Sequence, residues 1–133
     1  MKRFVLDASA LMAFFERRAG ADQVEELLRQ AGESGRPLLM SVVNWGEVYY
    51  SVWRMRGEAV ANQKLVEIAQ LPIEVVDVDM AMTKQAAGLR AQHKLPYVDC
   101  FAAALAHHHK ATLATSDEDF AQIGKTVGIL WVK

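Results

Sequence analysis

The chain has 133 residues, of which 52% are hydrophobic and 23% charged, a composition that fits a folded protein and argues against intrinsic disorder. Its net charge of −1 lacks the strong positive balance of many nucleic-acid-binding proteins, so a polyanion would need a local basic patch or a metal-bridged pocket. The single cysteine, Cys100, excludes an intramolecular disulfide and a cysteine-rich zinc site.

The first half of the chain alternates short apolar runs with stretches of helical periodicity. The run "RFVLD" predicts a buried strand that ends in a carboxylate, Asp7, and Ser9 is expected to cap the helix that follows. The predicted elements are a strand at 3–7, helices at 9–18 and 21–35, a strand that starts at 38 and passes near Ser41 into a helix at 42–56, and a helix at 58–71.

The second half opens with the β-branched run "IEVVDV", which is typical of a strand. Asp79 is expected to cap the helix after it, and Pro96 suits the first position of the next helix. The predicted elements are a strand at 73–78, helices at 79–94 and 96–110, a strand at 111–115, a short helix at 116–124 and a strand at 127–132.

This alternation predicts a single α/β domain, residues 1–133, with a central, mainly parallel sheet of about five strands flanked by helices. In open sheets of this class, ligands bind beyond the carboxyl ends of the strands. Asp7 follows the first strand and Asp117 follows the strand at 111–115. We therefore expect these two carboxylates to face one crevice.

We expect a cytoplasmic protein without a membrane span. Lys2 and Arg3 precede apolar residues, as in a signal peptide, but Asp7 interrupts the apolar run and charged residues stand at 16–18, where cleavage would need small ones. No apolar run approaches the length of a membrane span. The lone cysteine fits a reducing compartment.

Two more carboxylates are expected on helix faces that turn toward the interior. Asp99 shares a face of its helix with several alanines, whose small side chains allow a close approach to the sheet. Glu47 shares a face with Val43 and Tyr50, and a carboxylate among apolar neighbours needs a partner.

Four acids, Asp7, Glu47, Asp99 and Asp117, are thus candidates for one all-oxygen, negatively charged cage, which suits Mg²⁺ or Mn²⁺ better than zinc or copper. Without a cation, such carboxylates repel one another or take up protons. Asp7, Asp99 and Asp117 each also have a structural explanation, as a helix cap or a first-turn acid, whereas Glu47 is the least easily explained this way because its helix face is apolar. Asp119 lies close by in the sequence, and we interpret it mainly as part of the cap of a short helix.

Three segments place these acids in the order found in a known family: "VLDASAL", "SVVNWGEVYYSV" and "LPYVDCFAAALAHHHKATLATSDEDF". They resemble the acidic positions of PIN-domain nucleases, and most closely those of the VapC-type toxin ribonucleases of toxin–antitoxin systems. The resemblance extends from Phe4 to about Trp131, and residues 96–120 are its most specific part. It implies a PIN-like three-layer sandwich.

The resemblance also implies a function: a metal-dependent endoribonuclease that cleaves RNA phosphodiester bonds with a metal-activated water, usually as a homodimer that a cognate antitoxin holds inactive. Asp7 and Asp99 would then be the main ligands of Mg²⁺ or Mn²⁺, and Asp117 would complete the cage. Glu47 would hold a second metal or orient the attacking water. Thr115, or the serine after it, would hydrogen-bond an acid or a water.

Other function classes stay open at this point. A signalling receiver domain has a similar size and has acids at its strand ends. Asp77 or Asp79 would be its phosphoacceptor, Thr115 its switch hydroxyl and Lys125 its lysine partner, but two of the four acids would then have no role. A PIN fold that binds RNA without cleaving it is the second alternative, and a DNA-directed nuclease of the flap type is the third.

Overall fold

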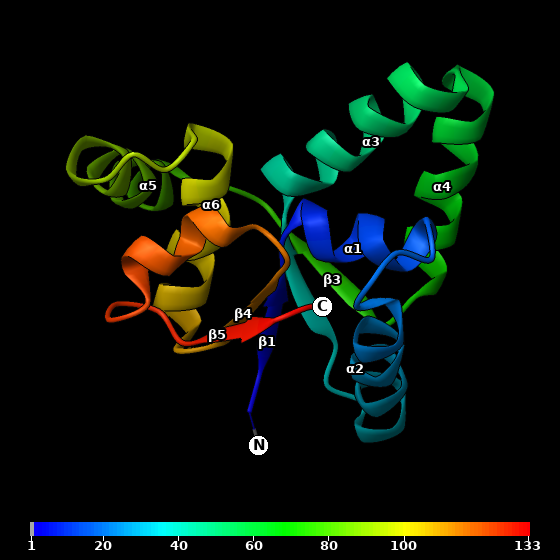
Figure 1. Ribbon diagram of the computed structural model, residues 1–133, viewed down its shortest axis with the longest axis horizontal. Coiled ribbons are helices and arrows are strands. Elements are labelled where there is room, and N and C mark those ends of the chain that lie inside the picture. The colour runs from blue at the N-terminus through cyan, green and yellow to red at the C-terminus, as the bar shows by residue number, and fades with distance from the viewer. Residues whose placement is uncertain (1) are drawn as a thin grey trace.

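A five-stranded sheet with the order β3-β2-β1-β4-β5 forms the middle layer of the computed structural model, which describes residues 2–133 (Figure 1). Each of its neighbouring strand pairs is parallel. The strands are β1 (Phe4–Leu6), β2 (Leu38–Ser41), β3 (Ile73–Val76), β4 (Thr112–Thr115) and β5 (Ile129–Trp131). The predicted α/β fold with a parallel sheet is confirmed.

Seven helices within the described residues flank this sheet. They are α1 (Ala8–Phe15), α2 (Ala21–Ser34), α3 (Val42–Arg56), α4 (Glu58–Gln70), α5 (Met80–Gln92), α6 (Tyr97–His109) and the 3₁₀ helix η1 (Glu118–Ile123). The first four pack mainly on one face of the sheet, and α5, α6 and η1 cover the other, which gives the predicted three-layer sandwich (Figure 1). None of these helices has both the length and the apolar character that crossing a membrane requires.

The strands are buried on both faces, as expected for a parallel sheet between two helical layers. On the α6 side the core includes Val5, Leu39 and Leu113, and on the α1 side it includes Leu6, Met40 and Ala114. The side chains of each strand thus alternate between two separate apolar clusters.

The strand register also lines up side chains at the carboxyl ends of the sheet. Thr115 of β4 pairs with Trp131 of β5, and one residue beyond β1, Asp7 is level with Thr115. Because alternate residues of a strand share a face, Asp7, Thr115 and Trp131 lie on the same side as Val5 and Leu113, toward α6. The strand order reverses direction between β1 and β4, and such switch points are where open α/β sheets bind ligands.

Two predicted helix starts are wrong. Helix α1 begins at Ala8, and its N-cap is Asp7 instead of Ser9, because the Asp7 carboxylate accepts the amide proton of Ala10. Pro96 is the N-cap of α6, not its first helical residue. The remaining predicted elements are confirmed, with small differences at their ends.

Gly20 connects α1 to α2 where the segment after β5 passes directly beside it. Its φ is +92°, and a Cβ at this position would lie 2.3 Å from Cγ1 of Val132 and 2.8 Å from the backbone nitrogen of Lys133. We expect Gly20→Ala to lower the free energy of unfolding by about 2–4 kcal/mol, since it adds backbone strain and an overlap with neighbouring backbone.

Gly35, which follows α2, provides the matched control for Gly20. Its φ is +72°, but no atom lies within 4 Å of the position that a Cβ would take. Gly35→Ala should therefore lower the free energy of unfolding by only about 1 kcal/mol, because only the backbone conformation is strained. Urea unfolding of both variants measures the difference, and equal losses would contradict the close contact at Gly20.

Candidate metal centre

Asp7 stands at the end of β1, where three donors fix its carboxylate. Only 2% of the residue is exposed. Oδ1 accepts hydrogen bonds from the amide of Ala10 (2.9 Å) and the hydroxyl of Ser9 (2.8 Å), and Oδ2 accepts one from the hydroxyl of Thr115 (2.5 Å). Burial raises the pKa of Asp7, and the same hydrogen bonds oppose that rise. Asp7 is therefore both the cap of α1 and a carboxylate held in one orientation at the switch point.

The hydroxyl groups of Ser9 and Thr115 tie the loop after β4 to the start of α1. Their oxygens lie 3.2 Å apart, and the Ser9 oxygen also accepts the amide proton of Ser116 (3.1 Å). The Thr115 oxygen accepts the amide proton of Asp117 (3.0 Å). Of the two hydroxyl residues predicted to contact an acid or a water, Thr115 at the end of β4 contacts Asp7 with its side chain, whereas Ser116 contributes its backbone amide. This network holds Asp117 beside Asp7.

Asp99 lies in the first turn of α6 and is 7% exposed. The alanines at 102–104 are fully buried, so this helix approaches the sheet closely, as the sequence predicts. Burial, followed by the negative charge of Asp117 and a hydrogen bond with it, raises the pKa of Asp99 to about 8. The charges of Glu47 and Asp7 raise this pKa further. The three other candidate acids thus all act on Asp99.

The Glu47 side chain, on α3, belongs to the same group of acids as Asp7, Asp99 and Asp117. Burial is the main cause that raises the pKa of Glu47, and the charges of Asp7 and Asp117 add to it. Asn44, one helical turn earlier, opposes the rise by hydrogen bonding. The Asn44 side chain is fully buried, and its Nδ2 donates to the carbonyl oxygen of Val98 in the first turn of α6 (3.2 Å). Asn44 therefore connects the helix that carries Glu47 to the helix that carries Asp99.

Asp117 follows β4 and caps η1 by accepting the amide proton of Asp119 (2.9 Å). Asp99, Asp117 and Asp119 each offer a carboxylate oxygen, and these oxygens lie within 4.8 Å of one another. The interpretation of Asp119 as mainly a capping residue is thus incomplete, because the tight turn of η1 brings it to the other acids. The signal in the sequence is the pair of aspartates two residues apart directly after a strand.

We call Asp7, Glu47, Asp99, Asp117 and Asp119 the acidic cluster. Among residues 2–133, no ion pair includes any of the five. The oxygen ligands of one Mg²⁺, at about 2.1 Å from the ion, are roughly 3–4 Å apart, so small shifts suffice to bring the oxygens of Asp99, Asp117 and Asp119 to that spacing. Mg²⁺ and Mn²⁺ also prefer carboxylate oxygens. The residues present therefore fit a divalent cation.

Comparison with known proteins gives the family of the chain. The family model described as "PIN domain" matches residues 4–126. The chain belongs to the PIN domain family. No curated protein sequence matches this PIN domain.

Solved structures similar to this PIN domain come from several bacteria. VapBC2 from Rickettsia felis, bound to a promoter DNA fragment, has a TM-score of 0.77 and 18% identity, with 98% of each chain covered. DNA-bound VapBC from Salmonella typhimurium has a TM-score of 0.74 and 17% identity, with 100% of each chain covered. VapC20 from Mycobacterium tuberculosis, a sarcin-ricin loop cleaving toxin, has a TM-score of 0.71 and 17% identity, with 91% of this chain and 95% of that chain covered. These similarities confirm the predicted fold.

Membership of the PIN domain family excludes the receiver-domain alternative. The positions of the residues that a receiver domain would use agree with this exclusion. Thr115 donates its hydroxyl proton to Asp7. Asp79 caps α5 by accepting the amide proton of Met82 (2.8 Å), and Asp77 is exposed after the edge strand β3. The hydroxyl and the acids that a receiver needs together thus have separate structural roles in this PIN domain.

Proposed function

We propose that this PIN domain is a cytoplasmic, metal-dependent endoribonuclease and the toxin of a type II toxin–antitoxin pair. The observation that carries the proposal is the convergence of the acidic cluster at the switch point of the sheet, with no cationic side chain of residues 2–133 paired to it. Membership of the PIN domain family supports a nuclease. The similar structures include VapBC complexes and a toxin named for cleaving the sarcin-ricin loop, which supports RNA as the substrate and an antitoxin as the partner.

The proposed cation, Mg²⁺ or Mn²⁺, would be held by Asp7, Asp99 and Asp117, with Asp119 as a further ligand at the exposed side of the cluster. A divalent cation bound here supplies positive charge to the scissile phosphate and activates water for attack on phosphorus. Thr115 holds the Asp7 carboxylate in place by hydrogen bonding.

Glu47 is proposed to orient the attacking water and accept its proton. It is half-buried, and its raised pKa brings a carboxylate base closer to neutral pH, where general bases act best. Asn44 holds the Glu47 helix against α6.

A homodimer and an antitoxin are the proposed protein partners. Exposed apolar side chains gather on the second half of α3, where Tyr50, Trp53 and Met55 are 50%, 43% and 52% exposed. Aromatic residues and methionine are enriched in protein interfaces, so this helix supports a contact with another chain.

The test is the incubation of purified protein with a mixed RNA pool in the presence of Mg²⁺ or Mn²⁺, followed by the same reaction with chelator. We expect cleavage that requires the metal and returns when excess metal is added back. Cleavage that persists in chelator would contradict the metal-dependent mechanism. RNA binding without cleavage in any metal would favour the non-cleaving alternative.

A further inference from the structure

We infer that a hollow beside the acidic cluster binds one unpaired base of the RNA, with Trp131 as its stacking surface; this rests on the proposed function. The hollow has a volume of about 440 Å³, within the range of small-ligand sites in proteins. We call it the Trp131 hollow, and it is lined by Ser116, Glu118, Ala121, Trp131, Val132 and Lys133.

The Trp131 hollow lies beside the acidic cluster, although none of the five acids lines it. Trp131 is the register partner of Thr115, whose hydroxyl donates to Asp7, and neighbouring strands lie only about 4.8 Å apart. The side chains of Asp7, Thr115 and Trp131 share the α6 face of the sheet. On the other wall, Ser116 and Glu118 flank Asp117 in the sequence. A polymer with one phosphate at the cluster thus brings its next nucleotide to this hollow.

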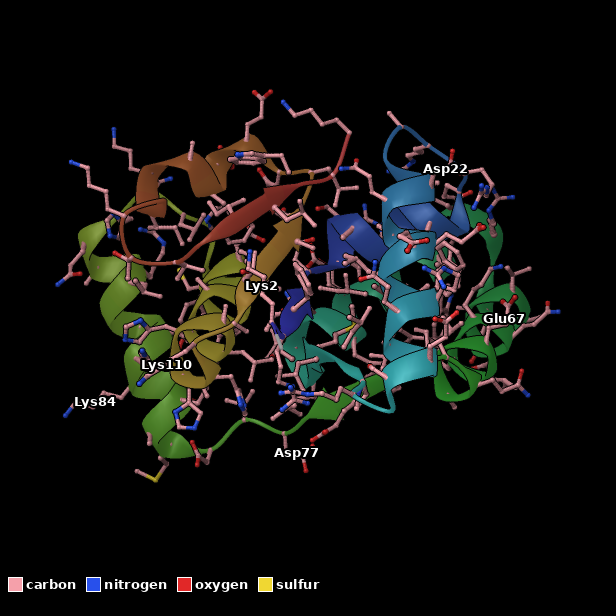
Figure 2. All side chains as sticks on the ribbon, turned by 90° about the horizontal axis from the view of Figure 1, so that it is seen from below. Lys2, Asp22, Glu67, Asp77, Lys84 and Lys110 are labelled. Carbon is pink, nitrogen blue, oxygen red and sulfur yellow. The ribbon has the colours of Figure 1, made fainter. Side chains whose placement is uncertain are left out.

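The hollow lies at the edge of the sheet, since β5 is the outermost strand. Figure 2 shows β5 and the segment after it running along the rim of the molecule beside η1. A strand of RNA therefore has room to pass from the cluster through the hollow and leave the protein at this edge.

The segment that carries Trp131 is held before any ligand arrives. The amide of Val132 donates to the carbonyl of Thr115 (2.9 Å). On the opposite side, the Gln23 side chain donates to the carbonyl of Trp131 (3.2 Å) and accepts the amide proton of Lys133 (2.7 Å). The indole itself is half-buried and packs partly against the core on the α6 side. A fixed aromatic surface binds with less loss of conformational freedom than a mobile one.

The chemistry of the lining favours a base over a second phosphate. An indole stacks on the flat face of any nucleobase, and such stacking tolerates different sequences. The Glu118 carboxylate repels phosphate but accepts hydrogen bonds from base amino groups, as the Ser116 hydroxyl also does. Lys133 supplies the cation for a backbone phosphate at the rim. The sugar–phosphate chain is therefore expected to stay outside while the base enters.

The test measures binding of a short, unstructured, fluorescently labelled RNA oligonucleotide by anisotropy, in Ca²⁺ and separately in chelator. We expect Trp131→Ala to weaken binding about tenfold and Trp131→Phe to restore most of it, because stacking needs an aromatic ring. Met80→Ala is the control, since this apolar side chain is 89% exposed on α5 outside the hollow, and it should bind like the wild type. Circular dichroism and thermal unfolding verify that each variant is folded.

Oligonucleotides in which one base at a time is removed identify the contact. Removal of the base that enters the hollow should weaken binding to the wild type by the same factor as Trp131→Ala does. The same removal should cause no additional loss of affinity in the Trp131→Ala variant. Equal affinity of folded Trp131→Ala and wild type, or equal loss for every abasic oligonucleotide, would overturn the inference. RNA binding that depends on Trp131, without cleavage in Mg²⁺, would support the proposed base-binding hollow and contradict the proposed nuclease activity. Cleavage that Trp131→Ala leaves unaffected would support the nuclease activity and contradict the hollow.

Discussion

Replacing Asp99 with asparagine is expected to lower the rate of metal-dependent RNA cleavage by about 10²–10³-fold. Asp99 is the acid on which Asp7, Glu47 and Asp117 all act, and the amide keeps its shape but removes the negative charge that a cation needs. The substitution should not unfold the protein, because asparagine has nearly the shape of the protonated carboxyl group that the raised pKa of Asp99 favours without metal. Initial rates on one RNA substrate, measured over a range of Mg²⁺ concentrations, provide the comparison.

Asp77→Asn is the matched control for Asp99→Asn. Asp77 also follows a strand of the sheet, but its side chain points outward, away from the core (Figure 2). Its removal should leave the rate unchanged. Asp119→Asn distinguishes two ligand sets: a rate like that of wild type would exclude Asp119, whereas a large loss would place it among the ligands. Full activity of Asp99→Asn would contradict the proposed site.

In the absence of metal, the protein should become less stable as the pH rises from about 4 to about 8. The pKa of Asp99 is about 8 in the folded protein, compared with an ordinary value of 3.8. Between these values the folded state binds a proton that the unfolded state has released, so raising the pH favours unfolding. We expect the free energy of unfolding to fall by roughly 2–5 kcal/mol across this pH range. The raised pKa values of Asp7 and Glu47 act in the same direction.

Urea unfolding in chelator at several pH values measures this dependence. Asp99→Asn should have a much flatter profile, because the asparagine has no proton to lose. Saturating Mg²⁺ should restore stability at the higher pH, since an ion that binds only the folded state stabilises it. A profile that is equally steep in wild type and in Asp99→Asn would show that Asp99 does not titrate as expected.

Much of the fold follows from local patterns. Apolar runs ended by a carboxylate or a hydroxyl, with helical periodicity between them, give the order of strands and helices and therefore the parallel sheet. The same pattern points to Asp7 and Asp117, because both follow strands. The alanine-rich face of α6 points to Asp99, and burial of those alanines agrees with the expected close approach to the sheet.

Other features depend on three-dimensional detail that residue spacing does not contain. The face that suggested Glu47 includes Tyr50, which is 50% exposed, so this face is not turned fully toward the interior. Asp119 joins the cluster because the short helix predicted at 116–124 is a tight 3₁₀ helix, a difference that its residue pattern does not specify. The place of Trp131 beside Thr115 depends on the register of β4 and β5, which is fixed only when the sheet forms.

The double role of Asp7, as helix cap and as part of the acidic cluster, affects how a genetic selection for harmless variants should be interpreted. Under the proposed toxin function, changes at Asp7 would lower both the affinity for the cation and, because α1 loses its cap, the amount of folded protein. Changes at Asp99 would instead leave an abundant but inactive product that still occupies the proposed antitoxin. The two classes of survivor would differ in protein abundance, and only the second would sequester the antitoxin.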